Sequence, residues 1–365
     1  MKIGFVLDDT LDSTDGVQQY VLLLGNWLSK NGHEVHYLTS RSTRTDISNI
    51  HSLARNIGVN FNKNRLRMPL PTTNKKIKNL LTQEKFDILH IQMPYSPFLA
   101  GKIIKLAPKS SKIIGTFHIA PHSKSVVYLT KLLAKFQKMN ISKIKTIISV
   151  SEVAQEFANN TFKIKSVVIP NSVETNKYSP KGSIKKKYDI IFVGRFVARK
   201  GCIHLLYAIK FLKDQYPDYN LKVAIVGQGP MNQQLKNYVK DNNLSKYCKF
   251  YGYVSEDKKV SLLQSSKLAV FPSTGGESFG IVLIEAMASK ALVLAGNNPG
   301  YSVVMTKQSN TLFDPQRYKE LASMIYKFLN QEDIYNKELK FQQELIKKYD
   351  IEKVGSAIMQ VYLNN

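Results

Sequence analysis

Two separate stretches of the chain each begin with a short apolar run that leads through a polar turn into a helical segment. The first is residues 2–7, followed by an amphipathic segment at 17–29 and a second apolar run at 33–38. The second is residues 189–194, which restarts the same pattern. Apolar runs joined by helices are typical of parallel strands that are covered on both faces. With 365 residues, the chain is long enough for two domains. The sequence therefore predicts an α/β protein with two Rossmann-like, doubly wound domains.

The boundary between the two domains is expected where the apolar runs give way to polar sequence. Residues 176–188 are polar and contain Pro180 and Gly182, which favours a linker. We therefore expect a first domain at 1–175, a second at 189–345, and a final helical segment at 346–365. Further strands are expected at 88–91, 112–117, 146–150, 166–169, 221–227, 249–253, 268–272 and 291–295.

The most informative local motif is residues 275–286, which read Gly-Gly-Glu-Ser-Phe-Gly-Ile-Val-Leu-Ile-Glu-Ala. Residues 279–288 predict a buried helix, because they are apolar on nearly every side. Glu285 lies inside that helix and Glu277 lies at its start, and a buried carboxylate is costly unless something pairs with it. Glycines let the backbone approach a ligand, and the start of a helix favours an anion. The motif therefore predicts a phosphate cradle flanked by two carboxylates.

A second motif places cations in a strand-to-helix loop. Gly194 and Arg195 end one predicted strand, and Arg199, Lys200 and Gly201 open the next helix. Such loops lie on the ligand side of an open parallel sheet. Positive charge placed there in advance would suit an anionic ligand such as a phosphate. The alternative is a solvated helix start in a lysine-rich chain.

Charge is distributed unevenly along the chain, whose formal net charge is +25. Residues 47–151 contain 18 Lys and Arg but only two acids, Glu84 and Asp87. Such a basic field suits an anionic membrane, nucleic acid or a merely solvated surface. No nucleic-acid motif accompanies the charge, so we expect no nucleic-acid partner.

Within this basic region, residues 124–139 have apolar side chains at helical spacing. Lysines gather on another face of the predicted helix: Lys124, Lys131, Lys135 and Lys138. A basic amphipathic helix suits the surface of an anionic membrane. A helix packed into the core with a solvated lysine face remains the alternative.

The sequence also favours an intracellular location. Its two cysteines cannot form a disulfide framework or a metal site on their own. The first apolar run is ended by Asp8 and Asp9, which is too early for a signal peptide. No run approaches the roughly 18 apolar residues of a spanning helix. We therefore expect a cytoplasmic protein, peripheral on the inner face of the cell membrane, and no metal site.

The two glutamates with seven residues between them, preceded by Gly-Gly, resemble the signature of the family 4 retaining glycosyltransferases. The resemblance extends over nearly the whole chain. Within that family the chain is most similar to the bacterial phosphatidyl-myo-inositol mannosyltransferases, through residues 16–18, 116–118 and 275–280. The resemblance implies the GT-B fold, in which two Rossmann-like domains face each other across a cleft and the final helix crosses back to the first.

The resemblance also implies a reaction and the residues that perform it. A hexosyl group, mannose or glucose, would pass with retention from a GDP- or UDP-linked donor to a lipid-linked acceptor such as phosphatidylinositol, with neither cofactor nor metal. Catalytic roles fall on His118, Glu277, Arg195 and Lys200. Donor binding falls on Gly16, Arg195, Lys200, Val254, Glu256, Glu277, Phe279, Gly280 and Glu285. Acceptor binding falls on Gln18 and Lys124.

Three alternatives to this function stay open at the level of sequence. A transferase acting on a soluble sugar would share the motifs but need no membrane. A nucleotide-sugar epimerase of the same architecture would convert the donor without an acceptor. A basic nucleic-acid-binding protein would account for the charge but would leave Glu277 and Glu285 unexplained. The sequence does not indicate an oligomeric state.

Overall fold

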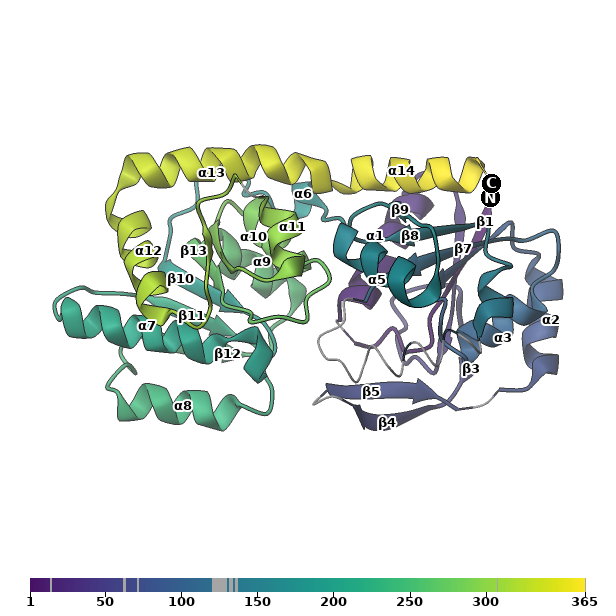
Figure 1. The fold of residues 1–365 in the computed structure, drawn as a ribbon, viewed down its shortest axis with the longest axis horizontal. Coiled ribbons are helices and arrows are strands. Elements are labelled where there is room, and N and C mark those ends of the chain that lie inside the picture. The colour runs from purple at the N-terminus through teal and green to yellow at the C-terminus, as the bar shows by residue number, and fades with distance from the viewer. Residues whose placement is uncertain are drawn as a thin grey trace. The chain divides into compact units, whose positions relative to one another are not determined.

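The computed structural model describes residues 1–13, 15–61, 64–70, 72–119, 130, 134, 137–306 and 308–364. The chain forms two compact units, each built around its own parallel sheet (Figure 1). Unit 1 consists of Met1–Asn171 together with Ile351–Asn365, and unit 2 consists of Ser172–Asp350. The second unit is therefore inserted into the chain of the first.

Unit 1 contains a seven-stranded sheet with the order β3-β2-β1-β6-β7-β8-β9. All of its strand pairs are parallel. The strands are β1 (Lys2–Val6), β2 (Glu34–Ser40), β3 (Ile50–Ala54), β6 (Ile88–Gln92), β7 (Lys112–Phe117), β8 (Thr146–Ser149) and β9 (Val167–Val168). From β1 the chain first adds strands on one side, β2 and β3, and then on the other side, beginning with β6, as in doubly wound sheets.

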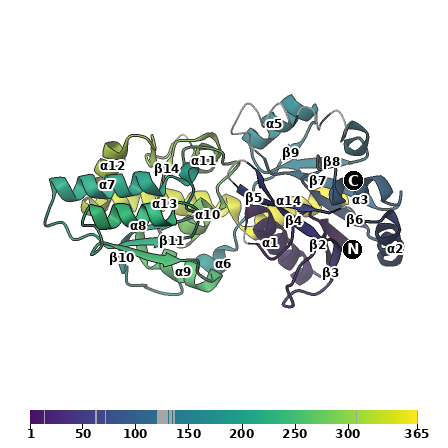
Figure 2. The same cartoon turned by 90° about the horizontal axis from the view of Figure 1, so that it is seen from below.

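Helices cover both faces of this sheet because side chains alternate along each strand. Phe5 packs on the side of α1 (Gly16–Lys30) and α14 (Ile351–Leu363), and these two helices lie side by side (Figure 2). Its neighbour Val6 packs on the other face, in the core shared by α2 (Asn74–Glu84), α3 (Leu99–Leu106) and α5 (Glu152–Phe162). The final helix of the chain is thus part of the first unit's core.

A separate antiparallel hairpin also belongs to unit 1. Strands β4 (Asn56–Phe61) and β5 (Asn64–Pro69) pair only with each other, apart from the parallel sheet (Figure 1). Neither this hairpin nor β3 was predicted from the sequence.

Unit 2 contains a six-stranded parallel sheet with the order β12-β11-β10-β13-β14-β15. Its strands are β10 (Tyr188–Val193), β11 (Val223–Val226), β12 (Cys248–Gly252), β13 (Ser266–Phe271), β14 (Leu292–Gly296) and β15 (Leu312–Phe313). One core holds α7 (Cys202–Gln215), α8 (Asn232–Asp241) and α12 (Tyr318–Asn330). The opposite core holds α6 (Thr175–Tyr178), α9 (Glu256–Gln264), α10 (Ile281–Ala288), α11 (Pro299–Met305) and α13 (Glu332–Ile346).

The predicted strands are present in both units, so the expectation of two Rossmann-like folds is confirmed. The helix expected at 279–288 was wrong at its start, because α10 begins at Ile281. Gly280 has a φ of +119°, and this left-handed conformation cannot continue a helix backward to Phe279. Among the residues that the structure describes, no helix combines the length and apolarity needed to cross a bilayer.

Candidate active site

The loops that follow β10 and β13 meet at the carboxyl edge of the unit 2 sheet, where ligands bind in open α/β folds. A short 3-10 turn, η1 (Ala198–Lys200), follows β10 and ends at Gly201. Gly201 has a φ of +71°, and a Cβ atom there would lie 1.8 Å from the carbonyl oxygen of Pro272. Only glycine lets the two loops approach this closely, so the cations of η1 are held against the segment after β13.

Glu277 is the centre of the charged cluster formed by these loops. Its Oε1 atom accepts from Arg199 Nη1 at 2.8 Å and from Ser273 Oγ at 2.9 Å. Lys200 Nζ lies 2.8 Å from Oε1 and 3.0 Å from Oε2. The Glu277 side chain is only 10% exposed. The carboxylate is therefore fixed in place by two cations and one hydroxyl group.

Positive charge exceeds negative charge in this cluster. Burial acts to raise the pKa of Glu277, but Lys200 and Arg199 outweigh it and lower the pKa, so the carboxylate is ionised. Burial lowers the pKa of Lys200, and the fields of Arg199 and Arg195 act in the same direction, against Glu277. One carboxylate thus offsets two adjacent cations, and the exposed Arg195 adds a third.

The N-cap of α10 lies three residues beyond Glu277. Gly280 is its N-cap, and a Cβ atom there would lie 2.7 Å from the ring of Tyr301. The first backbone N–H groups of a helix have no partner within the helix, and they favour an anion. Phe279 is buried, with its ring edge against Tyr349. The carboxylate, the cations and a helix start are therefore adjacent, as the motif predicted.

Glu285, inside α10, is paired with a lysine that the sequence analysis missed. Lys259 of α9 donates to Glu285 Oε1 at 2.8 Å and lies 3.0 Å from Glu256 Oε2. Tyr178 in turn donates to Glu256. Burial acts to lower the pKa of Lys259, but Glu285 and Glu256 outweigh it and raise the pKa. This ammonium group compensates for the cost of burying Glu285.

A cavity of about 470 Å³ opens beside β11 and β12 at the same edge of the sheet. Its lining includes Gln228 and Gly229, which lie just after the end of β11. Val254 and Glu256 are not among the lining residues, which are Gln228, Gly229, Asn232, Lys236, Phe250, Tyr251 and Gly252. Val254 instead packs partly against the core, and Glu256 begins α9.

In unit 1, His118 directly follows β7. Its Nε2 atom lies 2.7 Å from Gln92 Oε1, so this nitrogen carries the proton and donates it. The Tyr20 ring makes a T-shaped contact with the imidazole, with ring centroids 5.0 Å apart. Burial lowers the pKa of His118 to about 3, which leaves the imidazole neutral.

A neighbouring, fully buried histidine connects the sheet to the C-terminal helix. His90 lies 2.6 Å from the hydroxyl of Tyr362, which belongs to α14, and 2.6 Å from Thr116 Oγ1. Burial lowers the pKa of His90 to about 3, and the neighbouring His118 acts in the same direction. The C-terminal helix therefore reaches into the core beside His118.

The other site residues expected in unit 1 differ in burial, and some of them lie outside the described residues. Gly16 begins α1 and is exposed. Gln18 is buried, and its Nε2 atom donates to the carbonyl of Thr10 at 3.1 Å, which braces the loop after β1. Lys138 is exposed. Three expected lysines lie outside the described residues: Lys124, Lys131 and Lys135.

The sequence analysis left three contributors to the unit 2 site without an assigned role: Arg199, Ser273 and Lys259. Arg199 was recognised as part of the cationic loop, but diphosphate binding was assigned to its neighbour Lys200. The only sequence signal for Arg199 was its position beside that lysine. Ser273 follows β13, and its position at a strand end could have identified it. Lys259 carries no local signal, because its role comes from packing α9 against α10.

Two Rossmann-like units, with a cluster of cations at the carboxyl edge of the second, form the architecture of a GT-B glycosyltransferase. Comparison with known families agrees. Residues 14–177 match the family described as Glycosyltransferase Family 4, and residues 174–348 match Glycosyl transferases group 1. The chain belongs to these glycosyltransferases, which confirms the family expected from Glu277 and Glu285.

Particular relatives cover nearly the whole chain. A phosphatidyl-myo-inositol mannosyltransferase of Mycolicibacterium smegmatis is 28% identical, with 99% of this chain and 93% of the relative aligned. A glycosyltransferase structure from Rickettsia africae has a TM-score of 0.76 at 18% identity, covering 99% of this chain and 97% of the other. HepE from Anabaena, solved with UDP-glucose, has a TM-score of 0.76 at 16% identity, covering 100% of both chains.

Proposed function

We propose that this glycosyltransferase moves a hexosyl group, with retention and without a metal ion, from a GDP- or UDP-linked donor to a lipid-linked acceptor. Unit 2 would bind the donor and unit 1 the acceptor. The observation that carries the proposal is the excess of cations around Glu277. Arg199 and Lys200 share one carboxylate, and Arg195 adds to their field. A diphosphate would supply the negative charge that this cluster lacks.

The chemical role of these cations follows from the charge that develops during transfer. As the bond between the anomeric carbon and the diphosphate oxygen breaks, negative charge accumulates on the diphosphate. Donors fixed before the reaction stabilise that charge without reorganising. Arg195 and Lys200 would hold the diphosphate, and the backbone at Phe279 and Gly280 would donate to its phosphate oxygens at the start of α10.

Glu277 and Glu285 would recognise the rest of the donor. Glu277, held ionised by its cations, would accept hydrogen bonds from hydroxyl groups of the donor sugar. Glu285 would accept from the ribose hydroxyls, with Lys259 setting its position. Val254 and Glu256 would lie near the base, and Gly16 of unit 1 would approach the diphosphate.

We infer a same-face route for retention. The acceptor oxygen forms its bond to the anomeric carbon on the face from which the diphosphate departs, and its proton passes to a departing phosphate oxygen. His118 is neutral, because burial lowers its pKa to about 3, so it suits a hydrogen bond to the donor sugar rather than a positive charge. Gln18 and Lys124 would contact the acceptor.

The lipid acceptor is supported by the M. smegmatis relative, whose name gives phosphatidyl-myo-inositol as its acceptor. The basic region at 47–151 supports it independently, since such charge suits an anionic membrane surface. Docking there from the cytoplasm would place the protein, as a peripheral enzyme, on the inner face of the membrane.

The test is to incubate the full chain with GDP- and UDP-linked hexoses and membrane lipid extract, after treatment with a chelator. We expect release of one nucleoside diphosphate, GDP or UDP. One lipid should gain the mass of a hexose, and that hexose should keep the anomeric configuration it had in the donor. Conversion of the donor with no acceptor would establish the epimerase instead. Transfer only to soluble sugars would overturn the lipid acceptor, and strict dependence on added Mg²⁺ or Mn²⁺ would overturn the metal-free reaction.

A further inference from the structure

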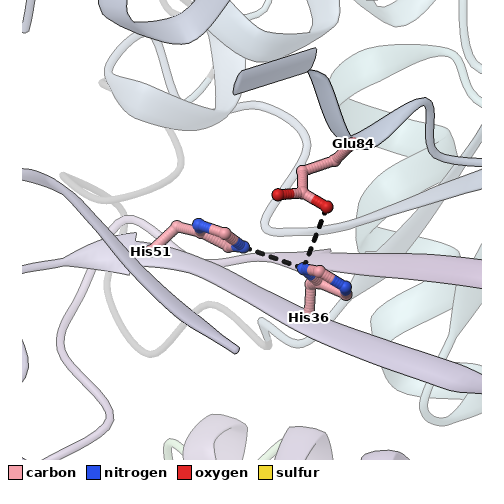
Figure 3. A group of neighbouring side chains, drawn as sticks. All are labelled: His36, His51 and Glu84. Atoms are coloured by element: carbon pink, nitrogen blue, oxygen red, sulfur yellow. Dashed lines mark hydrogen bonds and ion pairs between the residues drawn. The ribbon is translucent and has the colours of Figure 1, made fainter. Parts of the chain in front are cut away.

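A second group of functional side chains lies in unit 1, at the opposite edge of its sheet from the strand ends that bind ligands. His36 of β2, His51 of β3 and Glu84 at the end of α2 point toward one another (Figure 3). His36 Nδ1 lies 2.8 Å from His51 Nε2 and 3.9 Å from Glu84 Oε2. One ligand atom from each residue lies within 4.8 Å of the other two.

The two imidazole rings meet edge to edge rather than face to face. Their planes are within 4° of parallel and their centroids are 5.1 Å apart, while two ring nitrogens approach to 2.8 Å. Stacked faces at that centroid distance would hold the nitrogens farther apart. The nitrogens therefore aim at each other in one plane, and a proton on one of them bridges the pair.

Glu34 determines which nitrogen of His36 carries a proton. Glu34 Oε1 lies 2.9 Å from His36 Nε2, and an ionised carboxylate only accepts, so Nε2 carries the hydrogen. In the neutral ring, His36 Nδ1 then carries a lone pair that is directed into the cluster, and His51 donates to it. A histidine whose outer nitrogen donates to a carboxylate is the arrangement that orients metal-binding imidazoles.

Burial and charge also suit a cation. The side chain of His36 is 5% exposed and that of Glu84 is 16% exposed. Glu84 contributes the one carboxylate of the cluster. Lys2 Nζ is the present partner of this carboxylate, at 3.0 Å from Oε2.

We propose that His36, His51 and Glu84 form a binding site for one divalent transition-metal ion of the Zn²⁺ type. Two imidazoles and one carboxylate are ligands that such ions prefer, with water completing a tetrahedron. At Zn–N distances of about 2.05 Å the two nitrogens would separate to roughly 3.3 Å, and both rings would turn until the two lone pairs point at the metal instead of along the line between the nitrogens. The His51 proton moves from Nε2 to Nδ1, and Lys2 gives up Glu84 while keeping Glu34, to which it lies at 3.0 Å.

The place of the site in the fold indicates a stabilising role. Lys2 and Glu34 are the first residues of β1 and β2, so the cluster lies toward the amino ends of these strands. A metal there would bind three elements together: β2, the edge strand β3 and the end of α2. It would take no part in transfer, which occurs at carboxyl ends, so the proposal does not depend on the proposed function.

The experiment uses the full chain without a polyhistidine tag, freed of metal by a chelator and then titrated with Zn²⁺ and, separately, Co²⁺ and Mg²⁺. Calorimetry gives stoichiometry and affinity, Co²⁺ absorption reports four-coordinate geometry, and thermal unfolding reports stability. His51→Gln keeps a hydrogen-bonding side chain but removes the ligand. Lys2→Gln removes the competing cation. His33→Ala is the matched control, since His33 lies beside the N-terminal amine and could bind metal adventitiously.

We expect one Zn²⁺ per chain, an intense Co²⁺ band, a higher unfolding temperature with Zn²⁺, and none of these with Mg²⁺. Affinity should fall at least tenfold in His51→Gln, rise in Lys2→Gln, and stay unchanged in His33→Ala. Circular dichroism of each variant checks that it is folded, and Glu84→Gln serves as a second ligand variant should His51→Gln fail to fold. No Zn²⁺ binding by the wild type, or binding that persists in the ligand variant but is lost in His33→Ala, would overturn the site.

Discussion

At the residue scale, the single carboxylate of Glu277 contacts two cations, Arg199 and Lys200. Losing its charge should reduce the rate of transfer more than it reduces the stability of the fold. In Glu277→Gln the amide keeps an oxygen for Ser273 and Arg199 but loses the charge that fixes Lys200. We expect turnover to fall about a hundredfold or more, the scale of one preorganised electrostatic contact. Steady-state assays measure this, with Glu344→Gln, an exposed ion-pair partner of Lys347, as control. Near-wild-type turnover would remove Glu277 from the mechanism.

The buried His90 and the half-buried His118 should make the stability of unit 1 depend on pH. The pKa values of His90 and His118 are each lowered to about 3 in the folded chain, against about 6.5 when unfolded. Between these values the unfolded state binds more protons, so the free energy of unfolding falls as pH drops below about 6.5. For His90 alone the loss is about 1.4 kcal/mol per pH unit in that range.

Denaturant unfolding at pH 7.5 and 5.5 tests this pH dependence. The variant His118→Gln, which can still donate to Gln92, should lose less stability than the wild type between the two pH values. Equal losses in both proteins would show that His118 titrates normally in the folded state.

The buried pair of Lys259 and Glu285 should couple strongly. Lys259→Met takes the ammonium away from Glu285 Oε1, and removing one partner of a buried pair typically costs about 3–5 kcal/mol. Adding Glu285→Leu should recover most of that loss, because two apolar side chains replace the pair. Thermal unfolding of both variants measures the coupling, with Lys258→Met, an exposed neighbour, as control. Additive losses would show that the two residues act independently.

At the element scale, α14 is held against the rest of unit 1 by hydrogen bonds near both of its ends. Trp27 Nε1 donates to Glu352 at 2.8 Å near its start, and Tyr362 meets His90 near its finish. Tyr362→Phe leaves one His90 nitrogen without its partner in a buried site, which should cost about 1–3 kcal/mol. Chemical denaturation measures the loss. Tyr216→Phe, at a residue that is 42% exposed, should change stability by less than about 0.5 kcal/mol. An unchanged free energy of unfolding in Tyr362→Phe would contradict a stabilising role for the contact between Tyr362 and His90.

Elements with strong apolar runs could be predicted from the sequence, and those that depend on distant packing could not. The strand expected at 112–117 agrees with β7 residue for residue, because its apolar residues are bounded by clear polar turns. The final helical segment expected at 346–365 is present, but α14 occupies only Ile351–Leu363 of it. Edge strand β3 has only one fully buried residue, Leu53, so it carries little signal. The start of α10 depends on Gly280, whose left-handed φ ends the helix and whose missing Cβ leaves room for the Tyr301 ring of a later helix.

The active-site cluster shows the same division. Glu277 and Lys200 could be predicted because a recognisable motif surrounds each of them. Their direct contact could not, since it requires Gly201 to bring η1 against Pro272, 71 residues later in the chain. Lys259 could not be predicted either, because burial of a lysine follows from the position of Glu285 on a neighbouring helix.

At the scale of the whole molecule, the basic region at 47–151 should direct the enzyme to anionic lipid. Each lysine near such a surface contributes about 1 kcal/mol, so replacing Lys131, Lys135 and Lys138 by Ser should weaken binding by at most about 3 kcal/mol. Co-sedimentation with anionic liposomes at low and moderate salt measures this, beside nucleotide titration. The matched control replaces three exposed lysines of unit 2: Lys240, Lys327 and Lys348.

Donor binding should survive in the triple variant, because Arg195, Lys200 and Glu285 belong to unit 2. Equal sedimentation of wild type and triple variant would eliminate this docking site. Loss of nucleotide binding would show instead that the predicted helix at 124–139 packs in the core.

The insertion of unit 2 between the two parts of unit 1 determines the order in which the chain can be completed on the ribosome. All of unit 2 has been synthesised once Asp350 emerges. Val173 and Asp350, which lie at the two ends of unit 2, form a β-bridge within it. Unit 1 at that moment still lacks α14, so its core around Phe5 and His90 is open on one side. The part made first is therefore finished last, and a nascent chain stalled before Ile351 would present that uncovered face to chaperones.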